Sequence, residues 1–428
     1  MNSHKVLFKN IRIFIIILVG IALLALLGLY GLHLYQKHHQ APISMIIATD
    51  MHYISPDYIG DGAYFGTPSS TMDGKLINYS DEIIDAFISE VLEKKPQILL
   101  LSGDLTLNGS VKSHDELVEK LKTLQEAGIA VLVIPGNHDV NTPAGDYSGD
   151  EIVPVESYTG SGFLDCYENF GPARALSRDE ESFSYIYEAT PYLRILMLDS
   201  NCNRKGYVLD STLKWMEQEL RNAKRDGAEV LVVSHQNLYA HSELLSFSYQ
   251  FYNADQVLPL FEKYDVICNL SGHIHVQSIM KEKVPEISTA SLAIHNAQYG
   301  MLTYDGKTLD YTVCQTDVEA YAKAIHSTDE NLLNFNQYSR WYFEEVARQQ
   351  VYSKYTESEL PKKDVDLLAE TFAKINSAYF VGETIDTDAL AEGIALWRMQ
   401  TDNFILKYIE NMLEEAGVNN RSLTIDLR

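Results

Sequence analysis

Five short polar motifs each follow directly on an apolar run in this 428-residue chain. The runs are rich in β-favouring residues and have the length of buried strands. Polar residues that follow neighbouring strands gather at one edge of a sheet, so the pattern predicts a layered α/β protein with a polar site there. The runs and their motifs are Ser44–Thr49 before Asp50-Met51-His52, Gln97–Ser102 before Gly103-Asp104, Ala130–Pro135 before Gly136-Asn137-His138-Asp139, Ala228–Val233 before Ser234-His235, and Val266–Ser271 before Gly272-His273-Ile274-His275.

The residue types in these motifs are those that bind metal ions. Carboxylate and amide oxygens suit hard ions, and imidazole suits Fe, Mn, Zn and Ni. Asp50 and His52 stand two residues apart at a strand end, so only a bend would turn both side chains toward one ion. Asp104 offers two oxygens and is able to bridge two ions. A single such residue is usually a cap, a turn or a core residue, but the ordered set predicts a two-metal site.

At these positions the chain resembles the calcineurin-like metallophosphoesterase superfamily, whose pattern is D-x-H, G-D, G-N-H-D, H and G-H-x-H. The resemblance covers about residues 44–315. It implies an α/β or α+β layered fold of two packed mixed β-sheets flanked by helices. It also implies a hydrolase of phosphoric esters with two divalent or trivalent ions, for which Mn, Fe and Zn are all candidates.

The resemblance implies a role for each residue of the motifs. A hydroxide that bridges the two ions would attack phosphorus in line with the leaving oxygen. His138 would donate a hydrogen bond or a proton to that oxygen, and Asp139 would orient His138. The expected ligands are Asp50, His52 and His275 for one ion and Asn137, His235 and His273 for the other, with Asp104 as the bridge.

Three residues near the motifs are weaker candidates for substrate binding: Asn108, His241 and Tyr64. Support of the ligands or simple packing is the alternative for each of them. The residues after Asp104 depart from the G-D-x-x-D form of some protein phosphatases, which disfavours a phosphoprotein substrate.

The choice of substrate depends on a narrower resemblance. The Asp73-Gly74-Lys75 and Ser177-Arg178-Asp179 segments and the helical C-terminus are similar to bacterial members linked to cyclic-nucleotide phosphodiesterases. We therefore expect a phosphodiesterase that acts on small phosphorylated substrates such as cyclic nucleotides. The enzyme alternative is a phosphomonoesterase or a phospholipid-type hydrolase. A surface binding or scaffold protein with a vestigial metal site is the alternative of another class.

The N-terminus carries an apolar run from about Ile13 to Leu34, and Lys5, Lys9 and Arg12 precede it. Roughly 20 apolar residues are enough to span a bilayer, and basic residues before a span keep the N-terminus in the cytoplasm. We expect a single-pass membrane anchor within residues 1–40, with the rest of the chain outside the cytoplasm. Secretion after signal cleavage near Ala41 is the alternative, although the length of the run favours retention.

Periodicity divides the rest of the chain into a metallophosphoesterase domain at 41–316 and a small all-helical domain at 317–428. Two long segments, 53–79 and 141–182, are expected to form loops around the pocket. Apolar spacing predicts helices at Ser80–Lys94, Ser113–Glu126, Ser211–Arg225, Val318–Ile325, Glu330–Tyr355, Lys363–Ala378 and Thr387–Gly417.

The net charge limits the classes of molecule that the protein is expected to bind. The formal net charge of −25 disfavours binding to nucleic-acid polymers, because an acidic protein repels their phosphates. A small phosphorylated substrate is compatible with this charge, because bound metals reverse the potential locally.

The four cysteines lack CxxC spacing and fit isolated thiols, but neither their pairing nor the oligomeric state follows from the sequence. They are Cys166, Cys202, Cys268 and Cys314.

Overall fold

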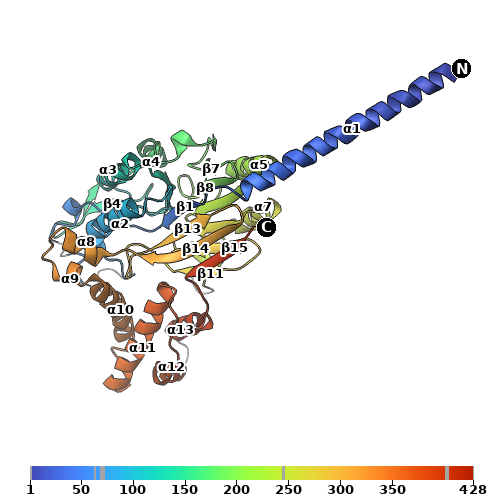
Figure 1. The fold of residues 1–428 in the computed structure, drawn as a ribbon. Coiled ribbons are helices and arrows are strands. Elements are labelled where there is room, and N and C mark those ends of the chain that lie inside the picture. The colour runs from blue at the N-terminus through green and yellow to red at the C-terminus, as the bar shows by residue number, and fades with distance from the viewer. Residues whose placement is uncertain (1, 62–63, 68–72, 243–245, 401–403, 428) are drawn as a thin grey trace.

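Two mixed β-sheets pack face to face in the computed structural model, which describes residues 2–427 except 62–63, 68–72, 243–245 and 401–403 (Figure 1). One large apolar core lies between the sheets, since residues of both contribute to it, among them Ile46 and Leu100 from one sheet and Ile195 and Leu231 from the other. This is the layered architecture that the motif pattern predicts.

The first sheet has the strand order β15-β14-β13-β1-β2-β3. Its strands β1, β2 and β3 run parallel to one another, and β13 pairs antiparallel with β1. Parallel neighbours end at the same edge, so the motifs after β1, β2 and β3 are brought together. The bounds are β1 Ile43–Ala48, β2 Ile98–Leu101, β3 Ala130–Val133, β13 Gln298–Tyr304, β14 Thr308–Gln315 and β15 Ser422–Asp426.

The second sheet has the strand order β11-β12-β10-β9-β8-β7-β6, in which β8, β9, β10 and β12 are parallel. A separate hairpin is formed by β4 Ala144–Asp146 and β5 Val153–Val155. The bounds of the second sheet are β6 Ser177–Arg178, β7 Tyr185–Thr190, β8 Leu193–Leu198, β9 Glu229–Ser234, β10 Cys268–Ser271, β11 Ser278–Met280 and β12 Glu286–Ser288.

Helices cover the outer faces of the sheets. On the first sheet, α2 (Ser80–Lys94) buries Ile84 and Phe87, and α3 (Val111–Glu126) begins at Ser110, whose side chain accepts from the Ser113 N–H. On the second sheet lie α5 (Asp210–Asp226), which ends at a left-handed Gly227, and α7 (Ala254–Lys263). The shorter helices are α4 Gly160–Tyr167 and α6 Ser246–Tyr249, with 3₁₀ turns at Pro56–Tyr58, Ile77–Tyr79 and Pro172–Arg174.

The expectation of a plain loop at 141–182 is wrong. This segment contains the β4–β5 hairpin, helix α4 and strand β6. Phe163 and Tyr167 of α4 are fully buried, and the Tyr167 hydroxyl lies 2.9 Å from Nδ1 of His114 on α3. The segment therefore packs on α3 as part of the domain.

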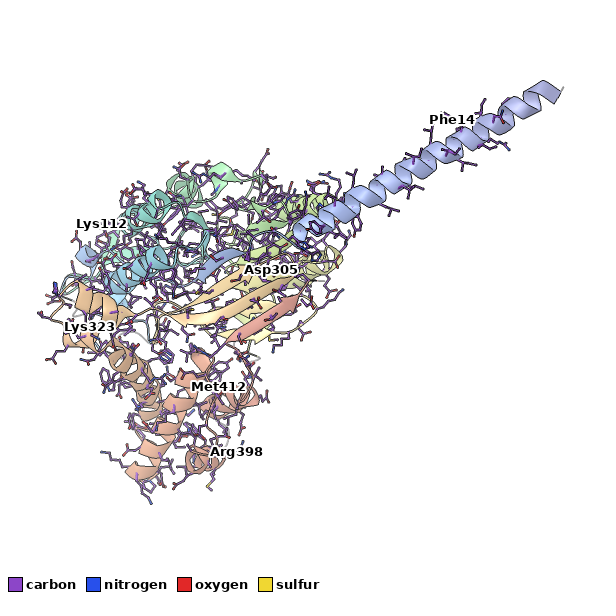
Figure 2. All side chains as sticks on the ribbon, viewed as in Figure 1. Phe14, Lys112, Asp305, Lys323, Arg398 and Met412 are labelled. Carbon is purple, nitrogen blue, oxygen red and sulfur yellow. The ribbon has the colours of Figure 1, made fainter. Side chains whose placement is uncertain are left out.

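The C-terminal part of the chain is helical over most of its length and has its own core around Trp397 and Phe372. Figure 2 marks it with Arg398 and Met412. The all-helical expectation is wrong at its end, because β15 returns to the first sheet and pairs antiparallel with β14. The helices are α8 Val318–Ala324, α9 Glu330–Leu333, α10 Phe335–Lys354, α11 Lys362–Phe380, α12 Ala391–Arg398 and α13 Phe404–Glu414.

Helix α1 (Asn2–Lys37) projects away from the sheets (Figure 1). Within the described residues, one helical stretch is long and apolar enough to cross a membrane, Asn10–Lys37, with a mean hydropathy of 3.0 in its most apolar part. A signal sequence has the same properties. The end of α1 touches the protein where β8 and β9 begin: Lys37 Nζ lies 2.5 Å from Glu229 Oε1, and the His33 ring lies 5.0 Å from that of Tyr192.

Candidate metal centre

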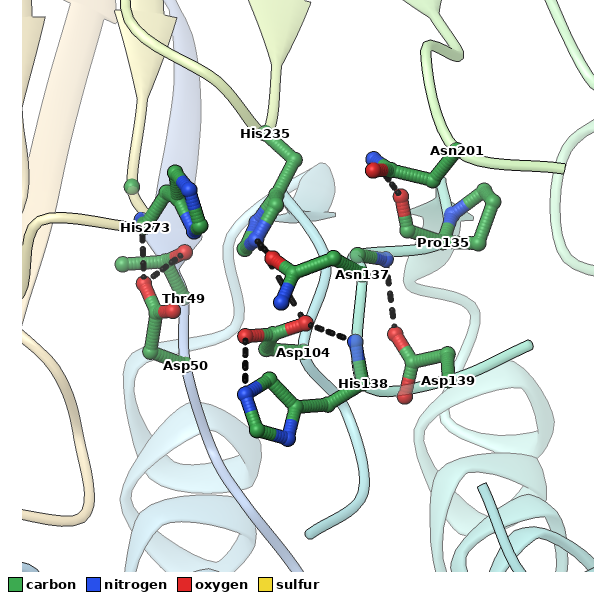
Figure 3. Close-up of polar contacts among 12 residues, drawn as sticks. Thr49, Asp50, Asp104, Pro135, Asn137, His138, Asp139, Asn201, His235 and His273 are labelled. Carbon is green, nitrogen blue, oxygen red and sulfur yellow. Dashed lines mark hydrogen bonds and ion pairs between the residues drawn. The ribbon is translucent and has the colours of Figure 1, made fainter. Parts of the chain in front are cut away.

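The five motifs meet at one edge of the two sheets, where β1, β2, β3, β9 and β10 end. Figure 3 shows side chains from the separate strands converging there, with Asp104 between His235 and His138. Two groups of side chains have ligand atoms that all lie within 4.8 Å of one another. These groups are Asp50, His52, Asp104 and His275, and Asp104, His235 and His273.

The first group draws its side chains from the ends of β1, β2 and β10. Nε2 of His52 lies 3.1 Å from Nε2 of His275, which in turn lies 3.2 Å from Oδ1 of Asp50. Oδ2 of Asp104 completes the group, 3.9 Å from Nε2 of His52. Two imidazole nitrogens and two carboxylate oxygens thus face one point.

The second group lies on the other side of Asp104. Oδ1 of Asp104 is 3.4 Å from Nε2 of His235, and that nitrogen is 3.0 Å from Oδ1 of Asn137. The rings of His235 and His273 are 4.7 Å apart between centroids. Asp104 therefore turns one oxygen toward each group, which is the arrangement that a bridging carboxylate requires.

The backbone is left-handed at most of these residues. The φ angles are 51° at Asp50, 45° at His52, 48° at Asp104, 68° at His273 and 63° at His275. Such a conformation costs about 1–3 kcal/mol for a residue with a side chain and persists where surrounding contacts impose it. The bend that the Asp50–His52 spacing requires is thus present, and it turns side chains that an extended strand would separate toward one side.

Two glycines allow the close approach of these turns. Gly103 has φ 97°, and a Cβ there would lie 2.7 Å from the nitrogen of Gly136 and 2.8 Å from Nδ1 of His235. A side chain at Gly136 would in turn collide with Asp104. The loops after β2 and β3 therefore interlock against His235 only because both positions lack a side chain.

The negative charges of two buried carboxylates in the centre favour the binding of a cation. Burial raises the pKa of Asp104, but the neighbouring His235 and His138 outweigh it and hold that pKa well below its usual value. Burial likewise opposes ionisation of Asp50, yet His275 lowers its pKa. Both buried carboxylates are therefore ionised. Oδ1 of Asp50 is buried, and its 3.2 Å contact with Nε2 of His275 lacks the geometry of a hydrogen bond, so a bound cation would stabilise this oxygen.

His235 shows where such a cation would bind. Burial lowers its pKa, but the attraction of Asp104 outweighs this and raises the pKa to about 9. Its Nδ1–H donates to the carbonyl of Ser102 at 2.9 Å, which turns Nε2 toward Asp104 and Asn137. A metal ion bound to Nε2 would replace the proton that Asp104 otherwise attracts. The donor set therefore fits metal ions.

A backbone carbonyl holds the ring of His138. Its Nδ1–H donates to the carbonyl of Leu107 at 2.8 Å, and its Nε2 lies 4.0 Å from Oδ2 of Asp104. Its side chain is 37% exposed and lines the cavity above the centre. The Leu107 carbonyl is therefore the direct partner of the His138 ring, and the expected orientation of His138 by Asp139 stays a prediction that would act through the backbone of the turn.

Asp139 joins the loops after β2 and β3. Its carboxylate accepts from the backbone N–H groups of Leu105, Thr106 and Gly136 at 3.0, 2.8 and 2.8 Å. Burial and the charge of Asp104 raise its pKa to about 7 against these hydrogen bonds. Asp139 thereby positions the turns that carry Asp104 and His138.

The three weaker candidates lie outside the described lining of the cavity at the centre, and their role in substrate binding stays a prediction. Asn108 is buried, and its amide donates to the Gly145 carbonyl at 3.4 Å. His241 is buried with Nε2 3.1 Å from Glu286. The ring of Tyr64 lies 5.0 Å from that of Tyr147.

Two lysines at the cavity, which were not among the predicted site residues, supply positive charge. The cavity has a volume of about 390 Å³. Lys75 is nearly buried and lies 2.8 Å from Asp73. Lys205 donates from Nζ to the carbonyl of Asn137 at 2.6 Å and to Oγ1 of Thr142 at 2.7 Å. The Asp73-Gly74-Lys75 segment was a signal for the first lysine, whereas no motif marked the second.

Comparison with known proteins agrees with this architecture. Residues 43–277 match the family model of the calcineurin-like phosphoesterases, and residues 317–419 match the model of the C-terminal domain of cyclic nucleotide phosphodiesterase. Together, the matched sequence and the His/Asp cluster define a metallophosphoesterase. The chain belongs to the calcineurin-like phosphoesterase family.

Individual relatives are distant. The chain is 26% identical over 205 residues to "Probable glycerophosphodiester phosphodiesterase GpdQ" of Arcobacter nitrofigilis, over 47% of this chain and 64% of that one, which is just under two thirds of its length. It is 23% identical over 243 residues to a 3′,5′-cyclic-nucleotide phosphodiesterase of Nostoc sp., over 56% and 73% of the two chains. A dimetal phosphatase of Danio rerio superimposes with a TM-score of 0.48 at 12% identity, over 64% and 96% of the chains.

Proposed function

We propose that this protein hydrolyses phosphodiesters of small molecules, nucleotides in particular, at a centre of two metal ions. The observation that carries the proposal is the placement of Asp104, whose Oδ1 lies 3.4 Å from His235 and whose Oδ2 lies 3.9 Å from His52. In this proposal the ligands are Asp50, His52 and His275 for one ion and Asn137, His235 and His273 for the other, with Asp104 shared.

Mn, Fe and Zn ions all suit this mixture of imidazole, carboxylate and amide ligands. Bound there, the ions would supply Lewis acidity toward the phosphoryl group and would activate a water molecule as the nucleophile. The ordered turns of the chain hold the ligands in place before substrate arrives, so little reorganisation is needed during the reaction.

His138 is the proposed proton donor to the leaving oxygen. The carbonyl of Leu107 fixes Nδ1–H, so Nε2 is the atom that faces the cavity. Oδ2 of Asp104 lies 4.0 Å from this nitrogen. A proton held at Nε2 would pass to the oxygen that departs from phosphorus.

Lys75 and Lys205 are proposed to bind the phosphate. Both line the cavity beside Asp104 and His138 in a protein with a net charge of −25. They would attract an anionic substrate that the rest of the surface repels. Lys205 would also fix the turn of Asn137, whose carbonyl accepts from its Nζ.

The preference for diesters over monoesters is supported by the names of the two relatives, both of which are phosphodiesterases. The match of residues 317–419 to a cyclic nucleotide phosphodiesterase domain favours a nucleotide. A phosphomonoesterase is the second candidate. A scaffold protein with a vestigial site is disfavoured, because every predicted ligand position is intact.

Residues 1–40 are proposed as a single-pass anchor with a cytoplasmic N-terminus, residues 41–316 as the catalytic domain and 317–428 as the helical domain. The end of α1 contacts Glu229, at the beginning of β9, whereas His235 follows the end of the same strand. The centre would therefore face away from the membrane that α1 enters, which disfavours a phospholipid of that membrane as substrate.

The test is metal-dependent hydrolysis by the full-length protein in detergent, wild type against Asp104→Asn. Chelator-stripped protein would receive Mn²⁺ and be offered bis-p-nitrophenyl phosphate and p-nitrophenyl phosphate. We expect metal to restore diester hydrolysis in the wild type, while turnover in the variant falls at least about 100-fold. Preference for the monoester would favour the second candidate. Absence of both bound metal and activity in the wild type would refute the proposal.

A further inference from the structure

A second cavity of about 230 Å³ adjoins the metal centre on the side of the helical segment. It shares Asp73, Tyr249, His273 and His275 with the cavity at the centre. A molecule whose phosphate lies at the centre therefore reaches the second cavity directly with the group attached to that phosphate.

The wall contributed by the helices is aromatic. Phe343 of α10 and Phe380 of α11 lie 5.1 Å apart between ring centroids, and Phe372 of α11 lies 6.3 Å from Tyr408 of α13. No charged side chain of the helices is part of the described lining. The phosphate cavity differs sharply, since Lys75 and Lys205 line it. The cavity at the metal centre thus suits a charged group, and the second cavity suits an uncharged flat group.

Two amides lie among these rings. Gln350 of α10 and Asn376 of α11 are the amide side chains that the helices contribute to the lining. Aromatic faces bind bases by stacking, and amides pair with the donor and acceptor atoms at a base edge. Glycerol or a simple alkyl group offers neither a flat face nor such an edge. The chemistry of the cavity therefore matches a nucleobase.

The aromatic wall is held firmly against the centre. Gly74 has φ 77°, and a Cβ there would lie 2.5 Å from the ring of Phe343, so the loop that carries Lys75 packs closely on α10. The backbone N–H of Gln277, two residues after His275, donates to the carbonyl of Phe380 at 2.8 Å. The segment after β10 thus links the candidate ligand His275 to the helical wall.

We infer that this compartment, with Phe343, Phe372, Phe380 and Tyr408 as its rings and Gln350 and Asn376 as its amides, binds the nucleobase of a nucleotide diester. The phosphate of that substrate would lie at the metal centre, and Tyr249 would border both parts. The inference depends on the proposed function and gives it a substrate class. It also gives the helical domain a direct part in substrate choice.

The experiment compares full-length wild type in detergent with Asn376→Leu and Tyr408→Ala. Asn336→Leu, the same change at an exposed position of α10, is the matched control. Each protein is assayed with a cyclic nucleotide and with glycerophosphoethanolamine, a diester without a ring. Both test variants should raise KM for the nucleotide by about fivefold to a hundredfold. Their KM for the glycerol diester and both constants of the control should stay within about twofold.

A second measurement separates this inference from the proposed function. Calorimetry of adenosine binding to chelator-treated protein needs neither metal nor turnover. Binding by the wild type that Tyr408→Ala weakens about tenfold would support the compartment even if no diester were hydrolysed. Two results would overturn the inference without contradicting the proposed hydrolase activity. One is an equal increase in KM for the cyclic nucleotide and the glycerol diester in the test variants. The other is adenosine binding that neither test variant changes. Failure of the wild type to bind adenosine would overturn it as well.

Discussion

Nε2 of His52 and Nε2 of His275 lie 3.1 Å apart, although 223 residues separate the two histidines along the chain. Oδ1 of Asp50 lies 3.2 Å from the same His275 nitrogen. The first histidine follows β1 and the second follows β10, strands of different sheets. The packing of the sheets therefore builds the candidate centre, and any change that shifts one sheet against the other would separate the ligands.

Replacement of His138 by Ala should lower kcat by roughly 10²–10⁴-fold, because the leaving oxygen would lose its proton donor. The loss should be smaller for a p-nitrophenyl ester, whose leaving group needs little protonation, than for an alkyl ester. Steady-state kinetics on both esters, with bound metal measured in the same samples, checks this. Unchanged turnover with metal bound would reject the role of His138.

Replacement of Lys205 by Met should raise KM for an anionic diester by about tenfold, because a cation that contacts the turn of Asn137 is removed. Lys323→Met is the control, since Lys323 lies exposed on α8 (Figure 2) and does not belong to the described lining of the cavity at the centre. KM should be measured at low and high salt. The difference between the Lys205 variant and wild type should shrink as salt screens the charge. Equal KM values for the two variants would contradict the prediction.

Replacement of Asp139 by Ala should destabilise the fold as well as reduce activity. Three backbone N–H groups would lose their acceptor, and each buried unsatisfied donor costs about 1–3 kcal/mol. The melting temperature of metal-free protein should fall by several degrees. If Asp139 acted only through His138, the metal-free protein would keep its melting temperature. The His138→Ala variant provides that comparison.

His295 makes the stability of the protein sensitive to acid. Burial, helped by the charge of Arg340, lowers its pKa from 6.5 to about 3, and Glu383 pairs with Arg340 beside it. In the unfolded chain His295 binds a proton below about pH 6.5, whereas in the folded protein it stays neutral until about pH 3. The free energy of unfolding therefore falls as the pH drops through that range.

The His295→Gln variant lacks this titration. It loses the ring packing on Phe343, 4.7 Å away, and should be less stable than wild type at pH 7.5. The difference in melting temperature between the variant and the wild type should shrink as the pH is lowered to 4.5. Only the wild type loses stability there, because its folded state keeps His295 neutral while its unfolded state binds a proton. Melting temperatures of both proteins across this range check the sign. A disadvantage that grows toward low pH would contradict it.

Local pattern was enough to predict the strands that carry the motifs. Asp50 and His52 follow β1, Asp104 follows β2 and His235 follows β9, within a residue or two of the expected ends. Such strands are marked by continuous apolar runs, because both faces of a central strand are buried. By contrast, β15 alternates half-buried Leu423 and Ile425 with exposed residues at the edge of the sheet, and this weaker pattern was overlooked.

The motifs in the sequence were enough to predict which residues are able to bind metal and which strand each of them follows. Three contacts were visible only in the folded protein: Asp139 accepts from backbone amides, Lys205 lies beside Asn137, and Phe380 forms a wall near His275. Each of these contacts joins segments that are distant in the chain or turned by unusual backbone angles, and their meeting depends on how sheets and helices pack. The motifs along the chain thus predict the types of ligand, whereas the packing of sheets and helices determines which residues lie beside them.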